Sequence, residues 1–319
     1  LQQPCVKVQW VGFQWFYRMC GSPMPKNLND GTNQPPRLKV YLNLGTLVDL
    51  PAFSNWPRLE GAEAMAYLKA AGFEGVQDGD PQHCQSAGIG STASGRVDAV
   101  TDAEPLARRF KDLGHEAATV HVGTGFEDDA QIDALVYAVL EASDKVGFPL
   151  YIETHRATIT QDPWRTIQLT RRIPDVRFNG DFSHYYTGQE LVYGDIEAKW
   201  RAMQPIFGRV RFMHGRIGSP GCIQVDIGDG DSAIPQVFGA DFLAHFRQMW
   251  TRAMAGFLKT AQPGDYLVFA PEILASHIYY ARKFTMPNGS LREESDRYAQ
   301  SLVYARIARE CFAAAAASL

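Results

Sequence analysis

The stretch 148–182, FPLYIETHRATITQDPWRTIQLTRRIPDVRFNGDF, contains the unit that decides the fold. It opens with the short apolar run FPLYIETH, which predicts a buried strand. The next run, DPWRTIQLTRRIP, predicts a helix that has Asp162 as its N-cap and Pro163 at its first position. The stretch 175–185, DVRFNGDFSHY, predicts a second strand. A strand, a helix and another strand in this order indicate a parallel βα unit.

The same alternation extends in both directions from this unit. Further strands are expected at 38–45, 73–79, 83–91, 116–123, 209–217 and 265–274, with helical patterns between them. Eight strands close a (β/α)8 barrel. The alternative, an open doubly wound sheet, usually has fewer strands and often a glycine-rich phosphate loop, which this chain lacks after its first strand. We therefore predict an α/β protein that forms a single (β/α)8 TIM barrel.

The first 36 residues differ in composition from the rest. The run VQWVGFQWFYRMC (8–20) is rich in aromatic residues, and GSPMPKNLNDGTNQPPR (21–37) is polar and rich in proline and glycine. We therefore expect residues 1–36 to be an N-terminal extension or linker that contributes little to the site. Residues 37–319 are expected to be the catalytic barrel domain.

Composition and charge exclude several classes of protein. Of the 319 residues, 45% are hydrophobic and 21% are charged, which is ordinary for a soluble globular protein. A net charge of −4 argues against a nucleic-acid binder, and no apolar run approaches the roughly 18 residues of a membrane helix. The five cysteines include no C-x-x-C pair, which argues against a disulfide framework or a structural zinc site. We predict a cytoplasmic protein.

Metal-competent side chains stand at the ends of the last four expected strands. Glu153 ends the fifth strand, Asp181 follows in the sixth, His214 lies in the seventh and Glu272 in the eighth. In a barrel the carboxyl ends of the strands face the active site, so the four side chains would share one rim. Any one of them alone would more often be a helix cap or a satisfied polar group. Three carboxylates and one imidazole favour Mn²⁺, Mg²⁺ or Co²⁺, with Zn²⁺ as a further option.

This set of four resembles the Glu–Asp–His–Glu metal set of the xylose-isomerase-like superfamily, and in particular its sugar epimerases and isomerases of the tagatose/psicose 3-epimerase kind. GFEGVQ (72–77) resembles the second strand of that superfamily, DFSHYY (181–186) its D-x-x-H turn, and HGRIGSPG (214–221) its loop after strand seven. The resemblance covers roughly residues 37–319. It implies a divalent ion held by the four side chains.

The resemblance also implies a reaction. Glu153 and Glu272 would flank the central cavity, so that one carboxylate removes a proton next to a carbonyl and the other returns it. The ion would hold an open-chain sugar by its carbonyl and an adjacent hydroxyl, giving a metal-stabilised enediolate. This predicts a divalent-metal-dependent isomerase or epimerase of a sugar or sugar derivative.

Further residues are candidates for binding the substrate. The resemblance implies this role for His184 and Arg216. His121, His155 and Arg156 are weaker candidates, because hydrogen bonds to the metal ligands would explain them about as well. The ketose 3-epimerases carry a further Glu shortly after the strand-five ligand, where this chain has His155 and Arg156. Arg156 would also suit an acidic or phosphorylated substrate.

Other functions remain open at this point. A lyase or dehydratase of a keto-sugar or cyclitol shares the first proton abstraction, although several such relatives have Gln where this chain has His214. An abasic-site endonuclease would need a trinuclear zinc cluster and a basic groove, whereas only His83 and His121 are available early in this acidic chain. A non-catalytic binding protein would have no use for the ligand set. The expected partner is a small-molecule sugar, neither nucleic acid nor membrane is expected, and a homo-oligomer is left open.

Overall fold

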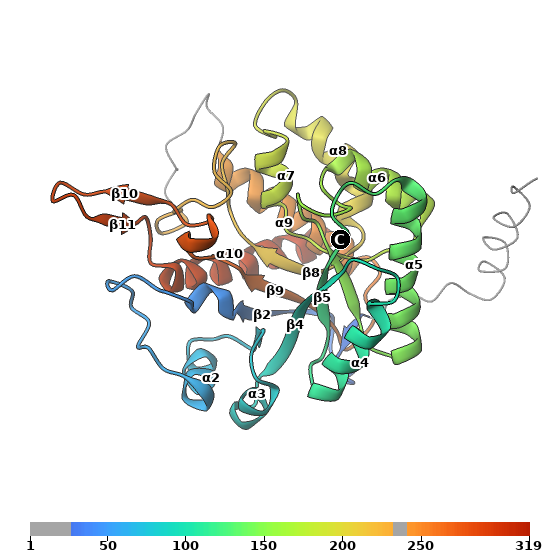
Figure 1. The fold of residues 1–319 in the computed structure, drawn as a ribbon, viewed down its shortest axis with the longest axis horizontal. Helices are drawn as coiled ribbons and strands as arrows, with labels where there is room; N and C mark the ends of the chain where they lie inside the picture. The colour runs from blue at the N-terminus through green and yellow to red at the C-terminus, as the bar shows by residue number, and fades with distance from the viewer. Residues whose placement is uncertain (1–26, 232–240) are drawn as a thin grey trace, which may run out of the picture.

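Eight parallel strands close into a barrel in the computed structural model, which describes residues 27–231 and 241–319 (Figure 1). The strands are β2 (Arg37–Asn43), β3 (Gly75–Gln77), β4 (Gly90–Val97), β5 (Ala118–Val122), β6 (Leu150–Glu153), β7 (Phe178–Asn179), β8 (Val210–Gly215) and β9 (Asp265–Pro271). Each pairs with the next along the chain, and β9 pairs with both β8 and β2. The predicted (β/α)8 barrel is confirmed.

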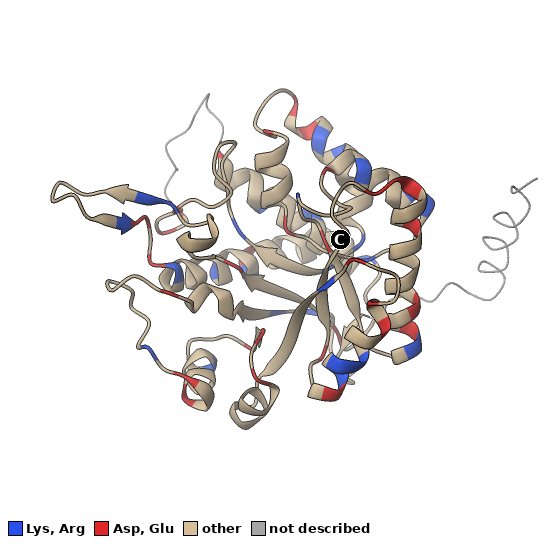
Figure 2. Ribbon diagram, viewed as in Figure 1, with Lys and Arg blue, Asp and Glu red and all other residues tan. Residues whose placement is uncertain are grey.

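Helices surround the barrel. They are α2 (Gly61–Ala70), α3 (Pro81–Ala87), α4 (Ala103–Leu113), α5 (Asp129–Val146), α6 (Pro163–Arg172), α7 (Ser183–Gly188), α8 (Ile196–Phe207), α9 (Phe242–Leu258) and α10 (Arg297–Ala317), with short 3-10 turns η1 (Leu44–Leu47) and η2 (Ser276–Ile278). The cap predicted for α6 is present, since the Asp162 carboxylate accepts from the Arg165 amide at 2.9 Å. Acidic and basic side chains lie close together on several of the outer helices, as on α4 (Figure 2), where Glu104 pairs with Arg108 and with Lys145 of α5.

Two expected strands are placed differently. The third was expected at 83–91, but residues 81–87 form α3 and the strand β4 follows at Gly90. The helix forms because the Asp80 side chain caps it and Pro81 occupies its first turn. The sixth strand was expected over 175–185, but β7 has two residues, and the Asp181 carboxylate then accepts from the Ser183 amide in a turn that opens α7.

The barrel interior consists of an apolar layer below a polar one. Side chains that face inward alternate with side chains that face the helices, which is the period of a strand. The lower layer includes Tyr41, Tyr151, Phe212 and Ala270, which are buried in one cluster. Two residues further along the same strands stand Asn43, Glu153, His214 and Glu272. The lower layer is tightly filled, because a Cβ on Gly75 would lie 2.4 Å from the Tyr41 ring.

A short strand before the barrel lies against its last strand. β1 (Leu28–Asn29) pairs antiparallel with β9. The side chains of Asn27 and Asn29 each donate to the Asp265 carboxylate at 2.8 Å. Residues 27–36 therefore contact the amino-terminal end of β9, whereas residues 1–26 lie outside the described part of the chain. The division into 1–36 and 37–319 stays a prediction.

A hairpin projects from the barrel between β9 and α10 (Figure 1). Its strands are β10 (Lys283–Thr285) and β11 (Leu291–Glu293), which pair with each other. Tyr280, at the root of this hairpin, returns to the barrel mouth and packs on Arg216. Across the described residues, no helix combines the length and the apolar character that crossing a bilayer requires.

Candidate metal centre

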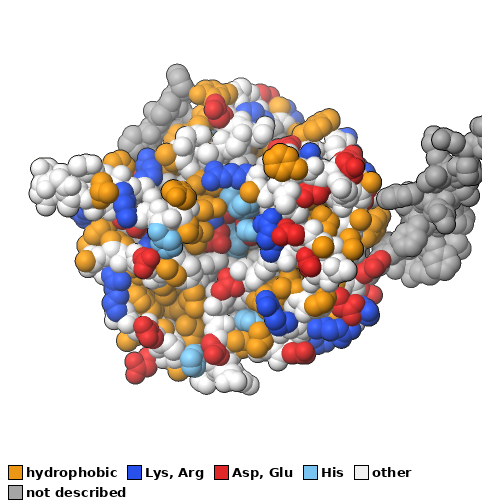
Figure 3. Space-filling model, viewed as in Figure 1, with side chains coloured by type: hydrophobic (Ala, Val, Ile, Leu, Met, Phe, Trp, Pro, Cys, Tyr) orange, Lys and Arg blue, Asp and Glu red, His pale blue; other side chains and the backbone are white. Residues whose placement is uncertain are grey.

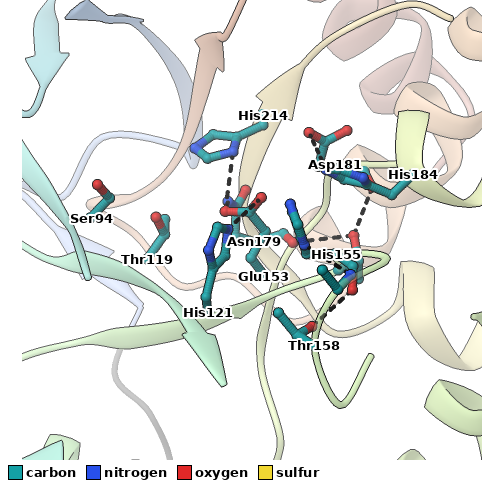
Figure 4. A network of polar contacts seen from close by, with 12 residues as sticks. Ser94, Thr119, His121, Glu153, His155, Thr158, Asn179, Asp181, His184 and His214 are labelled. Atoms are coloured by element: carbon teal, nitrogen blue, oxygen red, sulfur yellow. Dashed lines mark hydrogen bonds and ion pairs between the residues drawn. The ribbon is translucent and has the colours of Figure 1, made fainter. Parts of the chain in front are cut away.

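The four predicted ligands converge at the carboxyl end of the barrel. Glu153 ends β6, Asp181 follows β7, His214 lies in β8 and Glu272 follows β9. One ligand atom from each of them lies within 4.8 Å of the others. Figure 4 shows Glu153, Asp181 and His214 turned toward a common space, and Figure 3 shows histidine side chains in a hollow at the centre of this face. The geometry suits a shared site, while the assignment of the four as metal ligands stays a prediction.

His214 presents one ring nitrogen to two carboxylates. Its Nδ1 lies 3.4 Å from Glu153 Oε2 and 3.2 Å from Glu272 Oε2, and its Nε2 lies 2.8 Å from Gln77 Oε1. Burial disfavours the charged ring, but the neighbouring carboxylates of Glu272 and Glu153 raise the pKa of His214 well above its ordinary value. The imidazole therefore lies in a strongly negative environment.

Specific donors hold the three carboxylates, of which Glu153 and Asp181 are buried and Glu272 is partly buried. Asp181 Oδ1 accepts from the amide of Ser183 at 3.0 Å and from its hydroxyl at 2.6 Å. Glu153 accepts from Asn179 Nδ2 at 3.2 Å, and Glu272 accepts from Asn43 Nδ2 at 3.0 Å. Burial raises the pKa of Asp181 to about 6. In Glu153 and Glu272 burial opposes ionisation, but the charge of His214 together with that of His121 at Glu153 and of Arg216 at Glu272 outweighs it and lowers the pKa of both.

Arg216 supplies a fixed positive charge inside the cluster. Its guanidinium is 1% exposed and lies 3.2 Å from Asp181 Oδ2, and it also contacts Glu272 Oε2. The Tyr280 ring covers it at 4.3 Å. Arg216 was expected to bind substrate oxygens. It reaches the site, but its nearest partners are two of the candidate ligands, and a role toward substrate stays a prediction.

The residues present fit a divalent ion. Asp181 Oδ2 and His214 Nδ1 are buried and form no hydrogen bond within residues 27–231 and 241–319, although Arg216 lies 3.2 Å from the first and Glu272 Oε2 lies 3.2 Å from the second. Buried polar atoms normally form hydrogen bonds, so these two atoms have bonding capacity that a cation could use. Three carboxylates and an imidazole form an oxygen-rich donor set that suits Mn²⁺, Mg²⁺ or Co²⁺.

Three imidazoles form a row beside this cluster (Figure 4). The ring centroids of His121 and His155 are 4.3 Å apart, and those of His155 and His184 are 4.0 Å apart. His121 Nε2 lies 3.3 Å from Glu153 Oε1. His184 is fully buried, and neither of its ring nitrogens has a hydrogen-bond partner in the described part of the chain. These histidines border the candidate ligands, and their role toward substrate stays a prediction.

His121, Glu153 and His155 come close enough to suggest a second metal site. The hydrogen bonding of His155 argues against it. The Ala157 amide donates to His155 Nδ1 at 3.1 Å, so the proton of the neutral ring resides on Nε2. Burial lowers the pKa of His155 to about 4, which keeps this ring neutral. His155 is therefore a hydrogen-bond donor through Nε2 rather than a ligand.

Arg156 borders the cluster, whereas His83 remains apart from it. Arg156 is exposed, and its charge adds to the burial that lowers the pKa of His184. A role of Arg156 toward substrate stays a prediction. His83 is exposed on α3 and joins neither group of potential metal ligands found among the described residues. The early-strand ligand that an abasic-site endonuclease would require is therefore not provided by His83.

Sequence reasoning missed three buried amides that hold the candidate ligands. Asn43 and Gln77 end β2 and β3, and Asn179 ends β7. Asn43 contacts Glu272, Gln77 contacts His214, and Asn179 contacts Glu153. The sequence feature that could have revealed these amides is a polar residue at the end of a short apolar run, as in YLN (41–43) and GVQ (75–77). The same rule that found Glu153 would have found these residues if it had been applied to amides and to the early strands.

Comparison with family models finds no match for the chain, and comparison with curated proteins finds none. One solved structure similar to this chain is a xylose isomerase-like TIM barrel protein from Mycobacterium smegmatis in complex with magnesium. The two chains share 12% identity at a TM-score of 0.47, and the match covers 86% of this chain and 97% of the other. A probable 3-DHS dehydratase from Bacillus anthracis matches at 14% identity and a TM-score of 0.47, covering 75% and 94%.

A D-tagatose 3-epimerase-like protein also matches, at 12% identity and a TM-score of 0.40, covering 73% of this chain and 90% of that one. At these identities the similarity concerns the fold alone, and the barrel is established by the strand pairing of the chain itself.

Proposed function

We propose that this chain is a divalent-metal-dependent isomerase or epimerase that acts on a sugar or sugar derivative. The observation that carries the proposal is the convergence of Glu153, Asp181, His214 and Glu272 on one buried point at the carboxyl end of the barrel. Oxygen-rich sets at this end of a barrel are suited to catalysis, because the βα loops around them bind the substrate. A bound ion would supply Lewis-acid stabilisation of negative charge on a substrate oxygen.

Glu153 and Glu272 are the proposed proton-transfer pair. They approach His214 Nδ1 from different strands, at 3.4 Å and 3.2 Å. Their lowered pKa keeps both ionised near neutral pH, which is the state a general base requires. Asn179 holds Glu153 and Asn43 holds Glu272, so neither carboxylate turns freely. One would remove the proton next to the carbonyl and the other would return it.

The histidine row is proposed to bind substrate hydroxyls. His155 offers an Nε2 proton from a neutral ring, and the buried ring nitrogens of His184 form no hydrogen bond among the described residues, with Asp181 Oδ2 3.6 Å from Nε2. His121 borders Glu153 from β5. A polyol substrate would supply the acceptors and donors that these rings need. We further propose that the substrate is a small molecule and that the protein is cytoplasmic.

The test is hydrogen exchange at carbon. The full chain is loaded with Mg²⁺ or Mn²⁺ and incubated in D₂O with a panel of ketoses, aldoses and keto-acids, and the products are identified by NMR. We expect deuterium at a single carbon next to a carbonyl. Metal binding without any carbon exchange across the panel would count against the proposal. Loss of water with a new double bond would identify a lyase or dehydratase instead.

Glu272→Gln separates a catalytic role from a ligand role. The amide keeps the shape of the side chain but cannot accept the proton, so turnover should be lost even at Mn²⁺ concentrations that restore occupancy. Glu310→Gln is the control, because Glu310 lies on α10 and pairs with Arg247 and Arg306 at the surface. Full rescue of Glu272→Gln by excess metal would leave Glu272 as a ligand only.

A further inference from the structure

A buried chain of hydrogen bonds runs from the backbone after β2 to the imidazole of β8. It begins at the Gly45 amide, which donates to Asn43 Oδ1 at 2.8 Å. A backbone amide donates only, so this contact fixes the side-chain oxygen of Asn43 on that side. The space there is tight, since a Cβ on Gly45 would lie 2.8 Å from Asn43 Oδ1. The NH₂ group of Asn43 must therefore face the barrel interior.

The orientation of Asn43 fixes that of Gln77. Asn43 Nδ2 donates to Gln77 Oε1 and to Glu272 Oε1, both at 3.0 Å. If the Gln77 amide were reversed, two NH₂ groups would face each other without an acceptor. The NH₂ group of Gln77 instead donates to Thr119 Oγ1 at 2.8 Å. Asn43, Gln77 and Thr119 are all buried, so water does not compete for these contacts.

The orientation of Gln77 in turn fixes the ring of His214. His214 Nε2 lies 2.8 Å from Gln77 Oε1, which is an acceptor only, so Nε2 carries a proton. In the neutral ring the lone pair then belongs to Nδ1, the nitrogen that faces Glu153 and Glu272. A lone pair turned toward two carboxylates is repulsive unless a proton or a metal ion lies between them, so a bound divalent ion would take the place of a proton on Nδ1.

We infer that Asn43 and Gln77 are positioning residues, which orient His214 so that Nδ1 is available as a metal ligand. The inference rests on the proposed metal role of His214. Partners of this kind orient the ligating ring and hold its tautomer, and their loss typically weakens metal binding by about 10–100-fold. The two amides thereby connect β2 and β3, which carry none of the four candidate ligands, to the ligands on β8 and after β9.

The test is Mn²⁺ binding to the full chain without substrate, measured by titration calorimetry. Gln77→Leu removes the acceptor for Nε2 and should weaken Mn²⁺ binding by about 10–100-fold. Gln77→Glu keeps an acceptor for Nε2 and for Asn43, so it should restore the affinity to within a few-fold of wild type. Gln300→Leu is the control, because Gln300 is also buried but bonds to the backbone at 227 and 228. It should leave Mn²⁺ binding unchanged.

A second measurement does not depend on the variants folding. In the Mg²⁺-saturated wild-type chain, ¹H–¹⁵N couplings of the His214 ring should show a proton on Nε2 and none on Nδ1. A ring protonated on Nδ1 would overturn the inference, as would wild-type Mn²⁺ affinity in Gln77→Leu. If the wild-type chain itself binds no divalent ion, the proposed function fails together with the inference. If wild type and Gln77→Leu bind equally, only the positioning role fails.

Discussion

Replacing Arg216 by Met should destabilise the metal-free chain and increase its response to metal. The guanidinium is 1% exposed and lies 3.2 Å from Asp181 Oδ2, while its Nε donates to the Glu272 carbonyl at 3.1 Å. Removing one partner of a buried ion pair costs about 3–5 kcal/mol, because the remaining charge stays buried. A chain of this size changes its Tm by about 2 °C per kcal/mol, which gives a loss of about 6–10 °C.

The larger effect of metal on the Tm of the variant is expected because Arg216 and the proposed ion would contact the same carboxylates. A divalent ion held by Asp181 and Glu272 would replace the charge that Arg216 provided. Adding Mn²⁺ after EDTA treatment should therefore raise the Tm of Arg216→Met by more than that of wild type, as read by differential scanning fluorimetry. Arg172→Met is the matched control, because Arg172 pairs with Asp133 at 2.9 Å on the outer helices. Its Mn²⁺-induced rise in Tm should equal that of wild type.

Two results would refute this reasoning. The first is an Arg216→Met chain as stable as wild type without metal, which would mean that the guanidinium does not compensate the buried carboxylates. The second is an equal rise in Tm on adding Mn²⁺ to both chains. In that case the ion and Arg216 do not share Asp181 and Glu272, and the proposed ligand set needs revision.

Two further predictions concern the scaffold. Gly75→Ala should lower the free energy of unfolding in urea by about 1–3 kcal/mol, because the new Cβ meets the Tyr41 ring. Tyr41→Leu should recover part of that loss, and additive losses would contradict the packing argument. Burial lowers the pKa of His245, whose Nδ1 lies 2.7 Å from the Tyr186 hydroxyl. The folded chain thus favours the neutral ring, so its stability should be retained above about pH 6.5 and fall below it. His245→Gln should reduce this fall between pH 7 and pH 5, and an unchanged pH profile would exclude His245 as its source.

The barrel could be predicted because most strands are short apolar runs followed by a helical pattern, and several of the helices begin at a capping Asp, as α6 does at Asp162. The misplaced third strand shows the limit of that rule. The segment after Asp80 has few apolar residues, and its helix is marked by the cap at Asp80, by Pro81 in the first turn and by the left-handed Gly88 at its end. The pattern of apolar residues alone therefore does not decide whether this segment forms a strand or a helix.

The candidate ligands could be predicted because four successive strands each end in a carboxylate or an imidazole. The supporting amides could not be predicted as readily, because a neutral amide suggests no metal chemistry by itself and Asn after a strand is common in turns. Their importance depends on partners far away in the sequence, since Gln77 and His214 are 137 residues apart. Such a contact becomes visible only when the barrel has closed and β2 lies between β3 and β9.

The two-layer interior implies that the strands tolerate inserted or deleted residues much less well than the surface loops do. Each polar residue stands two positions after an apolar one on the same strand, as Glu153 follows Tyr151 and His214 follows Phe212. Deleting one residue within β6 or β8 would turn the functional side chain toward the helices and bring a hydrophobic one into the cavity. Changes of length in surface loops leave this alternation intact. Mutant libraries designed to find new substrates should therefore vary the lengths of the loops and contain no insertions or deletions within the strands.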